Sequence, residues 1–112
     1  MLTTLEKFRK KYNFHKKEVE NLYEKVKRVK CGNFENCYLK LNLWRNIEYH
    51  LEMEESYLIT IGRELKGLLS EECESKLFDE IRKLREIHNL AQLELEECEK
   101  CFFEKFAQVY KG

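Results

Sequence analysis

The chain has 112 residues, enough for one domain with a single hydrophobic core. Its 21 acidic and 21 basic residues cancel, and no basic face stands against an uncharged remainder, so nucleic acid is not expected as a partner. Residues 1–14 mix charges with apolar side chains, and nowhere is there an apolar run of membrane-spanning length, so we expect a soluble cytoplasmic protein without a signal peptide.

Proline is absent and charged residues make up 38% of the chain, a composition typical of long helices with solvated faces. A first helix is predicted to start at a capping box, Thr3 with Glu6, and to end at a turn over residues 31–33. In that turn Gly32 suits the left-handed position after a helix, and Asn33 suits the N-cap of the next one. The apolar side of the first helix recurs at intervals of three and four and includes a histidine: Leu5, Phe8, Tyr12, His15, Val19, Leu22, Val26 and Val29.

A second helix is predicted to end near residues 66–67, and Ser70 is predicted to cap a third helix with Glu71 and Glu72 in its first turn. No strand pattern is present. We therefore predict a single all-α domain over residues 1–112, an up-down-up antiparallel bundle of three long helices. The inner line of the second helix is Leu39, Leu43, Ile47, His50, Glu54, Leu58, Ile61 and Leu65. That of the third helix is Leu77, Ile81, Leu84, His88, Ala91, Leu95, Cys98, Phe102, Phe106 and Val109.

The three histidines are predicted to lie at one level of the bundle. In an antiparallel helical hairpin, residues equidistant from the turn have the same height. The midpoint between His15 and His50 falls between Gly32 and Asn33, and the midpoint between His50 and His88 falls at residue 69, inside the second predicted turn.

Glu54 follows His50 by one helical turn, and a buried carboxylate is costly unless it is paired. Imidazole and carboxylate ligands fit iron, zinc or manganese better than calcium or copper(I). We therefore predict a metal site formed by His15, His50, Glu54 and His88. The alternative is that the histidines are hydrogen-bonded core residues of a structural interaction module without a metal.

The residues around each histidine resemble the hemerythrin-like, or HHE cation-binding, domains. Residues 14–19 with Leu22 resemble the first helix of that family, residues 47–55 contain its second-helix motif His-x-x-x-Glu-Glu, and residues 84–90 are similar to its third-helix stretch. The resemblance implies a bundle that holds non-haem iron, as one or two ions, and that binds or senses oxygen, nitric oxide or peroxide. It also implies terminal ligands at the three histidines and a carboxylate of Glu54 that bridges two irons.

The fourth helix of that family, with its own ligands, has no counterpart here, and Leu84 stands where a further histidine is often found. Four protein ligands suit one ion with open coordination positions, unless a second chain contributes. Tyr12 and Gln92, one turn from His15 and His88, could form hydrogen bonds to a ligand or to bound water. The sequence indicates no substrate pocket and no acid–base pair, so enzymatic turnover is not predicted.

Four of the five cysteines are predicted to gather at one end of the bundle. Cys31 and Cys37 flank the first turn, Cys98 and Cys101 form a Cys-x-x-Cys on the third helix, and Cys37 should lie level with Cys101. Three states are open: free buried thiols, a disulfide such as Cys37–Cys101, or a four-thiolate site for zinc or an iron–sulfur cluster. Cys73 is predicted to pack near the second turn.

The third helix is predicted to extend past the first turn, and residues 102–110 of this tail are rich in apolar side chains. Either the tail folds over the first turn and covers the core, or it forms a contact surface. Three helices also leave the fourth corner of a hemerythrin-type bundle uncovered. We predict a homodimer, formed through this open side or through the tail from Phe102 to Tyr110.

Overall fold

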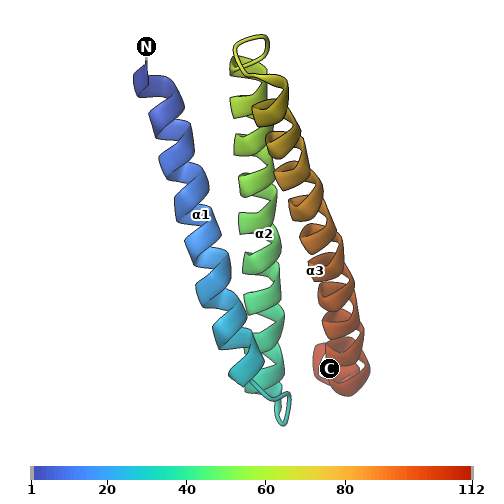
Figure 1. The fold of residues 1–112 in the computed structure, drawn as a ribbon. Helices are drawn as coiled ribbons and strands as arrows, with labels where there is room; N and C mark the ends of the chain where they lie inside the picture. The colour runs from blue at the N-terminus through green and yellow to red at the C-terminus, as the bar shows by residue number, and fades with distance from the viewer. Residues whose placement is uncertain (1, 112) are drawn as a thin grey trace.

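The structure, a computed structural model, describes the backbone of residues 2–111 and the side chains of residues 4–106. It consists of three helices, α1 (Leu2–Arg28), α2 (Phe34–Glu64) and α3 (Glu71–Lys111), and the described residues include no strand. The helices run antiparallel to their neighbours in the chain, with α2 between α1 and α3 (Figure 1). The predicted all-α fold of three long helices is confirmed.

Two of the predicted helix starts are confirmed by side-chain hydrogen bonds. The side chain of Asn33 accepts a hydrogen bond from the backbone N–H of Asn36 at 2.8 Å. Ser70 Oγ accepts one from the backbone N–H of Cys73 at 3.2 Å, and three glutamates occupy the first turn of α3. Each cap satisfies one of the backbone donors that a helix start leaves without a partner.

The prediction for the other helix ends is partly wrong. Since α1 begins at Leu2, Thr3 lies inside the helix and does not cap it. Because α1 already ends at Arg28, Gly32 is too far beyond the helix to occupy the left-handed closing position. The glycine with a left-handed backbone is instead Gly67, with φ of 82°, in the connection between α2 and α3.

The core is organised around α2. Both α1 and α3 contact α2, but in the described residues α1 and α3 do not approach each other closely. This explains why α2 contributes the largest share of the buried side chains, since it has a neighbour on two flanks. The buried apolar residues are Val19, Leu22 and Val26 on α1, Cys37, Leu41, Leu43, Trp44, Ile47, Leu51 and Leu58 on α2, and Leu84, Ala91, Leu95 and Phe102 on α3.

The end of α3 folds over the connection between α1 and α2. The ring of Phe34 lies 5.4 Å from that of Phe102 and 5.2 Å from that of Phe106, measured between centroids. The backbone of Phe106 departs from helical geometry, with φ of −123° and ψ of 18°. Of the two alternatives for the tail, Phe102 and Phe106 therefore cover the core, whereas Phe103 is 49% exposed. The side chains of Val109 and Tyr110 lie outside the described residues.

Cys31 and Cys37 form a disulfide, with their Cα atoms 4.4 Å apart, and the other three cysteines are free. The suggested Cys37–Cys101 bond is therefore wrong. Cys31 lies in the non-helical connection that leads directly into α2. It is therefore close to Cys37 in the sequence as well as in space, whereas Cys101 lies on a different helix. Cys73 is exposed rather than packed, because it lies in the first turn of α3 on the solvent side. No helix in the described part of the chain has the apolar character that crossing a membrane requires.

Two leucines on α2 provide a matched test of this core. Leu41→Ala removes a side chain that is 1% exposed and is expected to lower the free energy of unfolding by about 2–5 kcal/mol. Leu39→Ala, two residues earlier, removes a side chain that is 47% exposed and is expected to cost less than about 1 kcal/mol. Urea denaturation followed by circular dichroism measures both changes, and equal losses would contradict the placement of the core.

Candidate metal centre

His15 on α1 and His50 on α2 meet in the interface between these helices. Their Nδ1 atoms are 2.7 Å apart and their ring centroids 5.0 Å apart. At this separation the two nitrogens share one hydrogen bond, in which one ring donates and the other accepts. Their predicted equal height is confirmed by this contact. The rings that surround the pair are those of Phe14, Tyr49 and Tyr57.

Burial, with a smaller contribution from the neighbouring His50, lowers the pKa of His15 below its ordinary value. Burial therefore favours the neutral form of His15. A neutral imidazole is the form that binds a metal ion, because it keeps a lone pair on one ring nitrogen.

Glu54, one turn after His50, is buried with an exposed fraction of 3%. Burial raises the pKa of Glu54 to about 7, while Lys16 lowers it and Glu20 raises it further. Tyr12 and Glu54 line the same groove. Burial and the charge of Glu54 raise the pKa of Tyr12 to about 12, so its phenol stays protonated.

His88 lies on the other flank of α2, against a residue that the sequence analysis missed. Its Nδ1 is 3.5 Å from Glu55 Oε2, and Arg85 Nε donates a hydrogen bond to Glu55 Oε1 at 2.7 Å. The hydrogen bond from Arg85 is the main cause of the lowered pKa of Glu55. The opposite charges of Glu55 and Arg85, on neighbouring helices at similar heights, are the sequence signal that could have predicted this pair. Gln92 donates to Glu48 at 3.3 Å rather than to His88.

The structure thus brings together two of the four predicted ligands, His15 and His50. His15 contacts His50, Glu54 is one turn away on α2, and His88 faces α2 from α3. Equal height does not make the three imidazoles converge, because α1 and α3 pack on different flanks of α2. In the side-chain positions that the structure describes, no three His, Cys, Asp or Glu groups are close enough to hold an ion.

Two buried polar atoms have no hydrogen-bond partner among the described side chains, Glu54 Oε2 and His88 Nε2. Both belong to predicted ligands. An unpartnered buried donor or acceptor costs about 1–3 kcal/mol, and more when it is charged. A cation coordinated by these atoms would remove that penalty.

A groove between α1 and α3 leads to Glu54 from the open side of the bundle. Its volume is about 360 Å³, and it contains both acidic and basic side chains. The groove gives an ion or a small molecule a path to the carboxyl group of Glu54. Its lining residues are Tyr12, Lys16, Val19, Glu20, Tyr23, Leu51, Glu54, Glu80, Lys83, Leu84 and Ile87.

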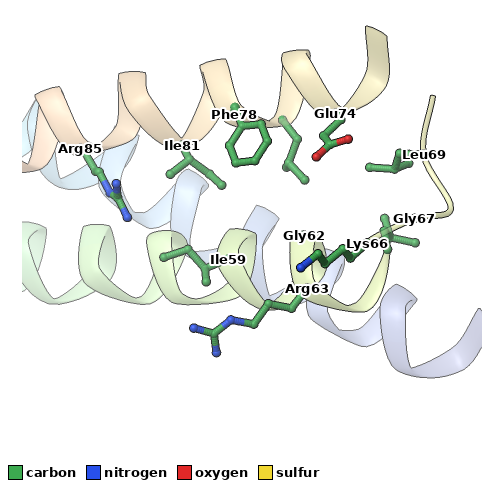
Figure 2. Close-up of a pocket in the computed structure, with 12 residues that line it drawn as sticks. Ile59, Gly62, Arg63, Lys66, Gly67, Leu69, Glu74, Phe78, Ile81 and Arg85 are labelled. Atoms are coloured by element: carbon green, nitrogen blue, oxygen red, sulfur yellow. The ribbon is translucent and has the colours of Figure 1, made fainter. Parts of the chain in front are cut away.

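A separate cavity of about 430 Å³ lies between α2 and α3 beside their connection (Figure 2). Its walls are mainly apolar, with Ile59 and Ile81 facing each other across it, and Arg63 lies at its edge. None of the four predicted ligands lines it. Arg85 lines its far end and also binds Glu55, so this cavity adjoins the His88–Glu55 pair.

Comparison with protein-family models, with curated proteins and with solved structures finds no match to this chain. The resemblance to hemerythrin-like domains therefore rests on the residues around the three histidines, and it stays a prediction.

The buried carboxyl group of Glu54 should make the free energy of unfolding depend on pH. Since its pKa rises from 4.5 to about 7 on folding, the folded state binds this proton more tightly than the unfolded state. The stabilisation by the proton is complete below the unfolded pKa and is lost as the pH rises through 7. In the presence of a chelator, the free energy of unfolding is expected to fall by about 2 kcal/mol between roughly pH 5 and pH 8.

Glu54→Gln is expected to remove this fall of the unfolding free energy with pH, because the amide does not ionise. The exposed Glu52, two residues earlier, provides the control, since Glu52→Gln should keep the pH dependence of the original protein. Urea titrations at several pH values measure the difference. Parallel profiles for the original protein and Glu54→Gln would contradict the assignment.

Proposed function

We propose that the protein binds a transition-metal ion between α1 and α2, through His15, His50 and Glu54, with His88 as the fourth ligand. Iron is the ion that the hemerythrin-like resemblance implies, and zinc or manganese would suit the same ligands. Two separate observations support this proposal: the direct contact between the imidazoles of His15 and His50, and the lack of a hydrogen-bond partner at the buried atoms Glu54 Oε2 and His88 Nε2.

The histidine pair requires only a small rearrangement to bind an ion. Two nitrogens bound to one tetrahedral ion at about 2.1 Å lie roughly 3.4 Å apart, so the Nδ1 atoms of His15 and His50 would separate by roughly 0.7 Å. The ion would replace the proton that the two rings now share. Glu54 would ionise on binding, because a cation favours its charged form.

His88 must change its side-chain rotamer to reach the proposed site. Its contact with Glu55 at 3.5 Å is long for a hydrogen bond, and its Nε2 has no partner, so few interactions oppose a change of its side-chain rotamer. Glu55 would keep its hydrogen bond from Arg85 after such a change. The two carboxylates of the His-x-x-x-Glu-Glu motif therefore have different roles, since Glu54 faces the ion and Glu55 binds α3.

Four protein ligands leave coordination positions open for a small molecule. Oxygen, nitric oxide or peroxide are the ligands that the hemerythrin-like resemblance implies, and the groove beside Glu54 gives access to molecules of this size. Tyr12 lines the groove with a protonated phenol, which could donate a hydrogen bond to such a ligand. In this role the protein binds the small molecule and does not convert it.

The alternative function is a helical interaction module, and the exposed apolar residues of α3 favour it. Ile87, Leu90 and Leu93 are exposed at a spacing that places them along one side of the helix. A second copy of the chain is the proposed partner. The rims of the adjoining groove carry both lysines and glutamates, Lys16, Glu20, Glu80 and Lys83, so two copies could pair opposite charges across a twofold axis.

Metal content tests the proposal directly. Protein purified without a histidine tag, in a Cys98→Ser/Cys101→Ser background, is expected to contain close to one ion per chain by mass spectrometry. His50→Ala is expected to lose the ion and keep its helical circular dichroism, because this substitution removes a ligand from the interface of α1 and α2. Glu52→Gln is the matched control, as it changes an exposed residue of the same helix and should keep the ion.

A protein that is purified empty and also refuses added Fe²⁺ under anaerobic conditions would overturn the metal proposal. The interaction module would then be the remaining function, and sedimentation would show whether Leu90→Glu separates two copies.

A further inference from the structure

Four cysteines line one small cavity at the end of the bundle where α1 connects to α2. The cavity has a volume of about 190 Å³ and lies between this connection and α3. Cys31 and Cys37 enter it as a disulfide, and Cys98 and Cys101 enter it as free, half-buried thiols one turn apart on α3. The predicted gathering of these four residues is confirmed.

We propose that Cys31, Cys37, Cys98 and Cys101 form a second metal site, which binds Zn²⁺ through four thiolates when the Cys31–Cys37 disulfide is reduced. In the oxidised state only two of the four sulfur atoms are free to act as ligands. Reduction supplies the other two.

The chemistry has two balanced steps. A dithiol reductant transfers two electrons and two protons to the Cys31–Cys37 disulfide, which becomes two thiols while the reductant becomes a disulfide. Zn²⁺ then displaces the four thiol protons and forms four zinc–sulfur bonds. Oxidation of Cys31 and Cys37 by a disulfide or peroxide reverses the first step and releases the ion.

A tetrahedral ion in this cavity requires the disulfide to open. Zinc–sulfur bonds of about 2.3 Å require sulfur atoms roughly 3.8 Å apart, so Cys31 and Cys37 must separate after reduction. Cys31 lies in the non-helical connection between α1 and α2, where the backbone can move. Cys98 and Cys101 are three residues apart on α3, so their side chains project from the same face.

The charges around the cavity have both signs. Lys105 Nζ lies 3.8 Å from Cys31 Sγ and 3.4 Å from the carbonyl oxygen of Cys31, and Lys40 lines the cavity. Both cations would stabilise the negative charge of four thiolates on one zinc ion. Glu94 and Glu97, which also line the cavity, act against it.

Titration with Co²⁺ and Zn²⁺ tests the site, because Co²⁺ bound to four thiolates has intense visible absorption that a histidine and carboxylate site lacks. The full chain, reduced under anaerobic conditions, is expected to bind one ion with this spectrum, and Zn²⁺ is expected to displace it. The oxidised chain and Cys98→Ser/Cys101→Ser are expected to lose the spectrum. Cys73→Ser is the matched control, because it changes an exposed cysteine away from the cavity and should keep it.

His50→Ala should keep the thiolate spectrum, so this result separates the second site from the proposed histidine site. Alkylation of unfolded protein should label three cysteines without a reductant and all five after reduction. Circular dichroism of the serine variant confirms that it folds. The proposal is overturned if the reduced chain lacks the thiolate spectrum, or if the oxidised chain binds equally well.

Discussion

The position of α2 between its two neighbours determines where every polar group of the core can find a partner. Because α1 and α3 pack on α2 and not on each other, α2 has two packed flanks and one face toward an open groove. His50 faces α1 and pairs with His15, whereas Glu55 faces α3 and pairs with Arg85. A closed triangle of helices would have placed these groups in one common core.

Glu54 and Glu55 show how strongly this geometry affects adjacent residues. They differ by about 100° around the helix axis, which directs them to different neighbours. Glu55 receives a hydrogen bond from Arg85 that lowers its pKa, whereas burial raises the pKa of Glu54 to about 7. A carboxyl group with this cost would destabilise a purely structural bundle, in which an apolar residue of similar size would serve better. The proposed cation would offset this cost by pairing with the carboxylate of Glu54.

The sequence was sufficient for the helices and their heights, but not for their lateral arrangement. Periodicity predicted three helices, the caps at Asn33 and Ser70 fixed two of their starts, and equidistance from the first turn placed His15 beside His50. Height follows from the rise per residue alone. Convergence with His88 depends on whether α1 and α3 touch, which is decided by side-chain packing along the whole bundle and not by any local signal.

The cysteine pairing illustrates the same distinction and has a consequence for stability. The Cys31–Cys37 disulfide joins residues only six apart, so the chain-entropy estimate of its stabilisation is about 2 kcal/mol, against about 4 kcal/mol for a bond from Cys37 to Cys101. A bond between Cys37 and Cys101 would also fasten α3 to the rest of the bundle, whereas the bond that forms leaves this task to packing around Phe102. The Cys31–Cys37 disulfide therefore contributes little stability and leaves the thiols of Cys98 and Cys101 on α3 free. A metal ion held by all four sulfur atoms would supply the missing link between α3 and the α1–α2 connection, so the reduced, zinc-bound state would be the more firmly joined one at this end.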